Sequence, residues 1–433
     1  MRKRLLLIGG GLVALAALVA GGGYIAYKAG LFRSTKTERG QTLGVNEAST
    51  PQAAPRRRTQ PSWPVFRYDA FRTGFNPGAH ARPPFSVVWK RGLYRDGYLE
   101  APAVTADGVI VYASYGKSFG SDLFAADALK GRLLWHKHFR HPANFAGSPG
   151  IGGGRVYITS HDGNIRVYDL RTGRLAWRMK IAAAESPPIV AGNLVYFGDG
   201  PSGGGDGHFR AVDVRTHRVV WSNRAAGNIS SGAALTRTTA YFSSYGGSVY
   251  ALDRFTGRLR WRTAVQGPSG GSVPFYSTPA LAGGNLILGG NDGSIYALDA
   301  RTGSQRWRSG GSGYVYSSAA VWHGRAFIGD FGGSFHALSV RTGNELWSKQ
   351  LGPILGSATV IDGIVYISAL RPATTYGFDA RTGREVWRFP DGQFSPIIAD
   401  EGDVWLVGKA HVYRLAERRA RAAPGGPLPG VDW

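Results

Sequence analysis

The chain has 433 residues, of which 43% are hydrophobic, and it contains 64 Gly, 12 Trp and no Cys. The lack of Cys excludes disulfides, thiolate metal sites, c-type haem attachment and a lipid-modified N-terminal Cys. The formal net charge of +23 favours anionic partners. Abundant Gly and aromatic residues, without a long stretch of 3.6-residue periodicity, predict many short strands rather than helices.

Residues 1–30 are predicted to form an N-terminal membrane anchor or a signal sequence. A mainly apolar, uncharged run from Leu5 to Tyr27 follows three basic residues, and its 23 residues can span a bilayer as a helix. A cleaved signal needs a shorter apolar core and a better cleavage site than Val19-Ala20-Gly21. We therefore favour an uncleaved anchor with its N-terminus inside the cell. Residues 31–60 are rich in Pro, Ser, Thr and charge, and are predicted to be a flexible linker.

Residues 61–433 are predicted to form one β-propeller. Seven copies of an 11-residue motif, exemplified by ALDRFTGRLRW at 251–261, end at Trp residues spaced 40 to 46 residues apart. This period, with strand-like sequence and Asp-Gly or Gly-Gly turns, is typical of four-stranded propeller blades. Each motif is predicted to be a structural joint, with its Trp packing against the neighbouring blade and its Gly forming a turn with positive φ.

The number of blades follows from an eighth Trp near the start of the propeller. Trp89 lies 46 residues before the next motif Trp, and no three strands precede it. At the other end, residues 394–416 supply three strands and then stop. We therefore predict eight blades, with the N-terminal strand completing the last one and closing the ring. The blade-docking residues are predicted to be Trp89, Trp135, Trp177, Trp221, Trp261, Trp307, Trp347 and Trp387.

The pattern Ala-x-Asp-x-x-Thr-Gly-x-x-x-Trp resembles the tryptophan-docking motif of PQQ-type propeller repeats, and WPVFRYDAFRTGFNP at 63–77 looks like the segment that leads into such propellers. The resemblance covers residues 61–416. It implies either a quinoprotein dehydrogenase or a non-enzymatic scaffold of the BamB type. The dehydrogenases hold PQQ over the propeller axis with calcium, an Asp base and commonly two adjacent cysteines. This chain has no Cys and lacks the long insertions that cover the cofactor.

The sequence offers several polar candidates for a site, all in loops. The Gly-rich segment 198–208 matches no phosphate-loop or EF-hand pattern. The His-rich segment 136–141 lacks a clear third zinc ligand. We therefore predict no metal site and no catalytic residues. Acidic and amide side chains before the first strand of a blade could point toward the central opening and would be the cofactor ligands of a quinoprotein; these are Glu100, Asn144, Glu185 and Asn228.

The two faces of the propeller are expected to differ in character. The Thr-Gly turns share the bottom face with the N-terminal tether and carry a predicted basic rim, which could face anionic lipid or envelope polymer. The rim is Arg171, Arg174, Arg215, Arg218, Arg258, Arg301, Arg341, Arg381 and Arg384. The top face carries the most variable loops, with Tyr, Phe, Arg and Asn suited to recognition of a partner.

The sequence thus favours a membrane-anchored, extracytoplasmic propeller that acts as a protein-binding or envelope-assembly scaffold. Its partners would be envelope proteins, and no cofactor is expected. The alternative is a PQQ-dependent alcohol or sugar dehydrogenase, for which PQQ and calcium would be required. A nucleic-acid partner is not expected of an exported protein, despite the basic charge.

Overall fold

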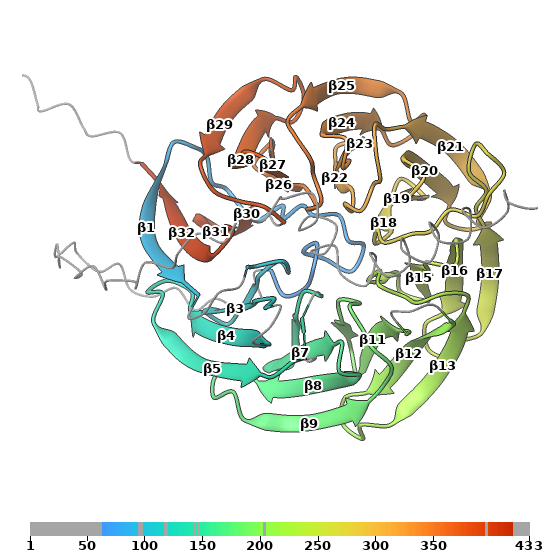
Figure 1. The fold of residues 1–433 in the computed structure, drawn as a ribbon, viewed down its shortest axis with the longest axis horizontal. Coiled ribbons are helices and arrows are strands. Elements are labelled where there is room, and N and C mark those ends of the chain that lie inside the picture. The colour runs from blue at the N-terminus through green and yellow to red at the C-terminus, as the bar shows by residue number, and fades with distance from the viewer. Residues whose placement is uncertain are drawn as a thin grey trace, which may run out of the picture.

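The structure, a computed structural model, describes residues 63–93, 98–116, 120–141, 144–145, 147–201, 205–394 and 397–418. These residues form eight four-stranded antiparallel sheets arranged as blades around a central axis (Figure 1). The predicted eight-bladed propeller is therefore confirmed. Within the described ranges, no helix has the length and apolar character needed to cross a membrane. The predicted anchor at 5–27 and linker at 31–60 lie outside them.

Each of the first four blades takes four consecutive strands, from the innermost outward. Blade 1 has β2 (Val104–Ala106), β3 (Val109–Ala113), β4 (Ser121–Asp127) and β5 (Leu133–Phe139). Blade 2 has β6 (Gly150–Gly152), β7 (Arg155–Ser160), β8 (Asn164–Asp169) and β9 (Leu175–Lys180). Blade 3 has β10 (Ile189–Ala191), β11 (Leu194–Asp199), β12 (Gly207–Asp213) and β13 (Val219–Ala225). Blade 4 has β14 (Ala234–Leu235), β15 (Thr239–Ser243), β16 (Ser248–Asp253) and β17 (Leu259–Ala264).

The next three blades repeat this order. Blade 5 has β18 (Ala280–Ala282), β19 (Asn285–Gly289), β20 (Ser294–Asp299) and β21 (Gln305–Gly310). Blade 6 has β22 (Ala320–Trp322), β23 (Arg325–Gly329), β24 (Ser334–Ser339) and β25 (Glu345–Gln350). Blade 7 has β26 (Thr359–Ile361), β27 (Ile364–Leu370), β28 (Ala373–Asp379) and β29 (Glu385–Phe389).

Blade 8 joins the first and last strands of the described chain. Its inner strands are β30 (Ile397–Asp400), β31 (Asp403–Val407) and β32 (His411–Glu417), and its outer strand is β1 (Phe85–Gly92). β1 pairs with β32 in antiparallel register, from Phe85 opposite Glu417 to Gly92 opposite His411. This pairing closes the ring as predicted and leaves no blade without its fourth strand.

The bottom face, as named above, also carries the turns between the first and second strands of each blade. The pairing of Phe85 with Glu417 at the start of β1 lies at this face. Just before β1, the His80 N–H donates to the Glu401 carbonyl and Arg82 forms an ion pair with Asp362. Glu401 and Asp362 both belong to first turns of their blades. The chain therefore enters β1 and leaves β32 on the face that carries the Thr-Gly turns.

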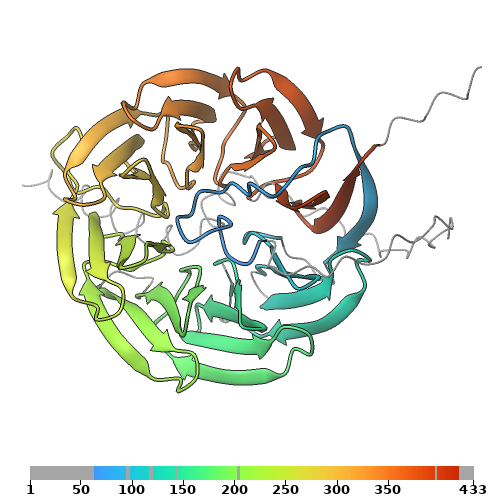
Figure 2. The same ribbon diagram turned by 180° about the vertical axis from the view of Figure 1, so that it is seen from behind.

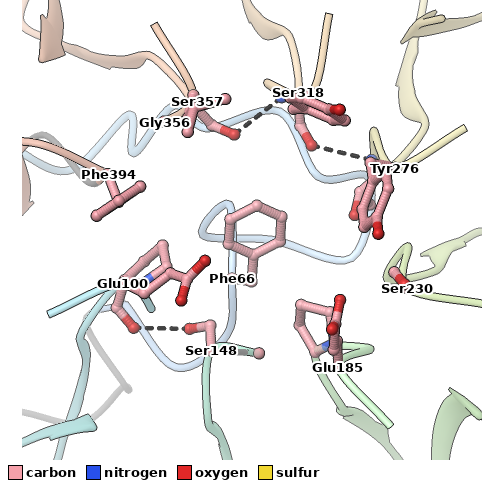
Figure 3. A pocket seen from close by; sticks show the side chains of 16 residues that line it. Phe66, Glu100, Ser148, Glu185, Ser230, Tyr276, Ser318, Gly356, Ser357 and Phe394 are labelled. Carbon is pink, nitrogen blue, oxygen red and sulfur yellow. Dashed lines mark hydrogen bonds between the residues drawn. The ribbon is translucent and has the colours of Figure 1, made fainter. Parts of the chain in front are cut away.

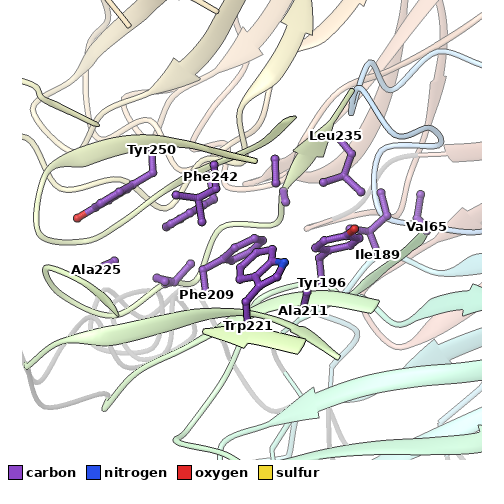
Figure 4. Close-up of a cluster of buried hydrophobic side chains, with 14 residues drawn as sticks. Val65, Ile189, Tyr196, Phe209, Ala211, Trp221, Ala225, Leu235, Phe242 and Tyr250 are labelled. Carbon is purple, nitrogen blue, oxygen red and sulfur yellow. The ribbon is translucent and has the colours of Figure 1, made fainter. Parts of the chain in front are cut away.

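The hydrophobic core is divided into eight clusters, and each lies between two neighbouring blades. One cluster joins blades 3 and 4, with Phe209 and Trp221 packed against Phe242 and Leu235 (Figure 4). The rings of Phe209 and Phe242 stack with centroids 4.3 Å apart. Because the apolar surface is buried between blades, each blade depends on its two neighbours for a core.

The motif Trp residues contact the next blade in a repeated way. Six of them donate an indole N–H to a backbone carbonyl of that blade, as Trp135 does to Leu170 at 2.8 Å and Trp307 to Val340 at 2.9 Å. The motif Gly of the next blade lies against the same indole. A Cβ added at Gly343 would lie 2.6 Å from Trp307 side-chain atoms, which is too close for any side chain.

In one joint the motif Gly is replaced by a His, and the imidazole ring packs on the Trp. His217 adopts a positive φ of 60° at the Gly position and stacks on Trp177, with centroids 4.9 Å apart. At the ring closure, Trp387 meets Phe85 of β1 edge-on at 5.4 Å instead of a Thr-Gly turn. The motif Asp caps its own turn, as when Asp253 Oδ1 accepts from the N–H groups of Phe255 and Thr256.

Candidate functional site

The segment that precedes β1 fills the middle of the propeller. Residues 63–81 run across the central opening as the blue trace in Figure 2. The segment follows the inner strands around the ring and accepts hydrogen bonds from one after another of their N–H groups. These bonds are Ile151 to Pro64, Leu235 to Ala70, Leu281 to Phe71, Val321 to Thr73 and Val360 to Gly74, with N···O distances of 2.6 to 2.9 Å.

Two buried Arg side chains fix this segment to the blades. Arg72 is fully buried, and its Nε donates to the Ala233 carbonyl at 2.7 Å. Arg67 donates through Nη2 to the Ala319 carbonyl at 2.5 Å and through Nη1 to the Ala358 carbonyl. Burial lowers the pKa of each guanidinium to about 9, partly offset by Asp69. The segment therefore acts as a plug, held by cations that use backbone carbonyls as acceptors.

A cavity of about 160 Å³ remains on the top side of the plug, with Phe66 in its middle (Figure 3). Its wall comes from the loops that enter the inner strands. In six blades the lining residue stands four positions before the inner strand begins, so one equivalent position of the repeat forms a ring. These residues are Glu100, Glu185, Ser230, Tyr276, Tyr316 and Leu355, and Phe394 lines the cavity from blade 8.

The charged groups that line the described part of the cavity are both acidic. Glu100 Oε2 is buried and has no hydrogen-bond partner among the described residues. Glu185 Oε1 lies 2.8 Å from His161 Nε2 and forms an ion pair with it. Burial, reinforced by the negative charge of Glu185 and opposed by His161, raises the pKa of Glu100 to about 8. Burial lowers the pKa of His161, but Glu185 and Glu100 outweigh it, so the pKa is raised overall.

The hydroxyl groups of the cavity wall mostly link one blade to the next. Ser357 Oγ accepts from the Ser318 N–H at 2.8 Å, and Ser318 Oγ accepts from the Thr278 N–H at 2.9 Å. Ser148 Oγ donates to the Pro102 carbonyl at 2.8 Å. These three hydroxyls are therefore committed to the scaffold, whereas Glu100 Oε2 is not.

Aromatic rings extend from the cavity over the top face in two chains. On the side of blades 8 and 1, Phe394, Tyr98 and Tyr115 follow one another with centroids 5.4 to 5.7 Å apart. On the side of blades 4 to 6, the chain is Tyr245, Tyr276, Tyr316 and Tyr314, with centroids 5.1 to 5.9 Å apart. The cavity mouth thus combines carboxylates with aromatic surface.

The four polar candidates from the sequence lie in different places. Glu100 and Glu185 line the central cavity. Asn228 does not line it, but shares with Glu185 a small adjoining pocket of about 10 Å³. Asn144 is buried within blade 2 at the edge of the site, where its Oδ1 accepts from Ser121. The structure therefore brings two of the four together at the axis.

The basic rim residues are all exposed around the Thr-Gly turns on the bottom face. Arg171 donates to the Asp107 carbonyl of the neighbouring blade, and Arg381 lies over the Trp322 ring at 5.5 Å. Exposed apolar side chains accompany them at the starts of outer strands: Leu175, Val219, Leu259 and Leu346. The rim is therefore a mixed cationic and apolar surface.

The sequence marks residues 63–77 as a lead-in segment, but it did not predict that they fill the channel or that aromatic residues line the cavity. Phe66, Arg67 and Arg72 lie in a segment without a periodic pattern, so nothing local marks them as buried. Tyr276 and Tyr316 could have been found by aligning the blades on the position of Glu100 and Glu185, because that position forms a ring at the axis.

Comparison with known families now identifies the chain. The family described as outer membrane protein assembly factor BamB matches residues 86–203 and 205–422. The chain belongs to this BamB family. The match spans most of the propeller and includes both ends of the closing blade, which agrees with the resemblance seen in the repeats.

Curated relatives match over parts of the chain. The chain is 30% identical over 123 residues to the serine/threonine-protein kinase AfsK of Streptomyces griseus, which is 26% of this chain and 15% of that protein. It is 25% identical over 190 residues to the dehydrogenase subunit of the quinone alcohol dehydrogenase of Gluconobacter oxydans, which is 41% of this chain and 21% of that protein. The BamB-family chain thus matches about a fifth or less of each relative's length.

Solved structures share the fold. The quinohemoprotein alcohol dehydrogenase of Comamonas testosteroni superimposes with a TM-score of 0.70 at 14% identity, covering 86% of this chain and 83% of that one. BamB from Moraxella catarrhalis superimposes with a TM-score of 0.62 at 16% identity, covering 79% of this chain and all of that one. By name, the first is an enzyme and the second is an assembly factor. The shared fold therefore does not decide the function of this BamB-family chain, which has to be inferred from its site.

The cavity residues do not fit PQQ with calcium. PQQ carries three carboxylates, and no Arg or Lys lines the described part of the cavity to neutralise them. Glu100 and Glu185 would instead add negative charge beside it. Within the described ranges, no three His, Asp or Glu residues are grouped to hold a metal ion. No step through this cofactor is therefore derived.

Proposed function

We propose that this BamB-family chain is a non-enzymatic, extracytoplasmic scaffold that receives a partner protein on its top face. Residues 5–27 would hold it in the membrane as a single-pass anchor. The observation that carries this proposal is the plug: residues 63–81 fill the channel and leave a cavity of about 160 Å³ whose described charges are acidic. The aromatic top face supports recognition of a protein, since Tyr and Phe supply large contact area there.

The bottom face supports an orientation in which it lies toward the membrane. The chain enters β1 and leaves β32 on that face, beside the nine exposed rim Arg residues. Juxtamembrane basic residues contribute about 1 kcal/mol each near an anionic surface. We infer that the rim faces anionic lipid or envelope polymer while the top face points away from the membrane.

Co-purification of the full-length protein in mild detergent tests the scaffold proposal. We expect an envelope protein to accompany the chain, and we expect this association to be lost when Tyr314 and Tyr316 at the top face are changed to Ser. The matched control changes Leu175 and Leu346 at the bottom rim to Ser. Loss of the partner only in the control would contradict a top-face site.

The second candidate is a PQQ-dependent oxidoreductase. The observations that favour it are the 25% identity to the Gluconobacter oxydans dehydrogenase subunit and the fold shared with quinohemoprotein alcohol dehydrogenase. A dye-reduction assay with added PQQ, calcium and an alcohol or sugar separates the two. Turnover that depends on PQQ would overturn the scaffold proposal.

A further inference from the structure

The top cavity has the features of a binding site for a small cation. We propose that it binds a primary ammonium group, carried either by a free alkylamine or by a Lys side chain of the partner protein. Glu100 Oε2 would accept a hydrogen bond from the ammonium, with Phe66 beside the alkyl chain. The Lys version deepens the proposed function and rests on it, whereas binding of a free amine does not.

The charges around the cavity favour a cationic ligand. The chain has a net charge of +23, so its surface as a whole repels cations. The described lining residues of the cavity include no Arg or Lys, and Glu185 is balanced by His161, so Glu100 adds an uncompensated negative charge once it has lost its proton. A buried carboxylate oxygen without a partner loses its hydration and gains nothing in return. A bound ammonium supplies both the missing donor and the missing charge.

The size and the surface of the cavity suit a short alkylammonium. An apolar protein cavity of about 150 Å³ admits a benzene molecule. The present cavity of about 160 Å³ therefore accommodates a four-carbon alkyl chain with its ammonium. Tyr276, Tyr316 and Phe394 line it as well, and aromatic rings attract cations within about 6 Å of their centroids. PQQ is larger and has the opposite charge.

Other polar groups of the cavity wall already have hydrogen-bond partners. Ser148, Ser318 and Ser357 already bond to neighbouring backbone groups, so they hold the blades together. Glu185 is paired with His161. Glu100 is therefore the acceptor that the fold leaves for a ligand.

Protonation gives the proposal a pH signature. The pKa of Glu100 is raised to about 8 by burial and by Glu185, while His161 opposes the shift. Tyr115 and Tyr276 also face the carboxylates, and burial raises the pKa of both phenols. An alkylammonium stays charged to about pH 10.4. Affinity should therefore increase as the pH rises from 6 to 9, because Glu100 loses its proton and becomes the anion that the ammonium needs.

Calorimetric titration of the full-length protein in detergent with n-butylammonium tests the site. We expect saturable binding that strengthens between pH 6 and pH 9, and no binding of the neutral isostere n-butanol. Glu100→Gln should weaken n-butylammonium binding at least tenfold and remove its pH dependence. The matched control is Glu401→Gln, the same chemical change at an exposed turn on the bottom face, which should bind as the wild type does.

Two arms distinguish the sources of the ammonium. A Gly-Lys-Gly peptide should compete with n-butylammonium if the natural ligand is a Lys side chain, and its acetyl-lysine counterpart should not. If n-butylammonium binds and the peptide does not displace it, the site is assigned to free amines. If neither binds, or if both bind Glu100→Gln as tightly as the wild type, the proposal is overturned. A partner retained in co-purification would then leave the scaffold proposal standing.

Discussion

Buried ionisable side chains on the two sides of the central channel differ in whether they have hydrogen-bond partners. On the plug side, Arg67 and Arg72 are buried but donate to backbone carbonyls of several blades. On the cavity side, Glu100 Oε2 is buried without a partner. A buried charge with partners ties the fold together, whereas one without partners lowers stability and remains available for binding. The difference separates the part of the channel that supports the structure from the part that can act.

Removing a plug cation should have the largest effect. Arg72→Met keeps the length of the side chain but leaves the carbonyls of Ala233 and Phe66 without their donor. We expect the free energy of unfolding to fall by about 3 kcal/mol, measured by urea unfolding of the full-length protein in detergent. Arg258→Met, at the exposed rim, should change it by less than about 0.5 kcal/mol. An equal fall in the free energy of unfolding for both variants would show that the buried plug residue stabilises the fold no more than the surface residue does.

The blade joints should come next. Gly343 and Gly324 have nearly the same φ, 74° and 75°, so Ala imposes the same backbone strain at both. A Cβ at Gly343 meets Trp307 at 2.6 Å, while nothing lies within 4 Å of one at Gly324. Gly343→Ala should therefore cost about 2 kcal/mol more than Gly324→Ala. Equal melting temperatures for the two variants would show that the indole moves aside at no cost.

Glu100 should make stability depend on pH. Its pKa is about 8 in the folded protein against 4.5 ordinarily, so the folded state holds a proton that the unfolded chain has released. Its contribution to stability is fully present below pH 4.5 and is lost as the pH rises through 8. Wild type should therefore lose stability relative to Glu100→Gln over this range, on the order of 2 kcal/mol allowing for water in the cavity.

Unfolding titrations of both proteins at pH 4, 6 and 9 measure that difference. The contribution of His161 has its own pH dependence but is shared by both proteins, so it largely cancels. A stability difference that stays constant with pH would mean that Glu100 is hydrated and ionised in the folded state.

The rim should show the smallest effect. Arg258→Gln should weaken binding to anionic vesicles by about fivefold, equivalent to about 1 kcal/mol, without changing stability. Lys180→Gln removes the same charge at the top end of β9 and should leave vesicle binding unchanged. Flotation of the two variants with anionic and neutral vesicles compares them. Equal loss in both would point to net charge rather than to the rim.

The sequence predicts the ring better than it predicts the channel. Regular spacing of the motif Trp residues reports the blades, because each one packs against the next, and the unpaired Trp89 reveals the closure. The path of residues 63–81 has no such signal, since their hydrogen bonds go to strands up to about 320 residues away. Asn144 and Glu100 look equivalent in sequence, yet only the fold shows that one bonds to Ser121 and the other enters the cavity.

Closure through blade 8 also sets an order of events during synthesis. The plug and β1 are made first, but the partner of β1 is β32, which ends at Glu417. Arg67 likewise waits for the carbonyls of Ala319 and Ala358. The earliest part of the propeller therefore stays open until nearly the whole chain has emerged, with an unpaired strand edge exposed throughout. This interval is when the chain most needs protection from aggregation.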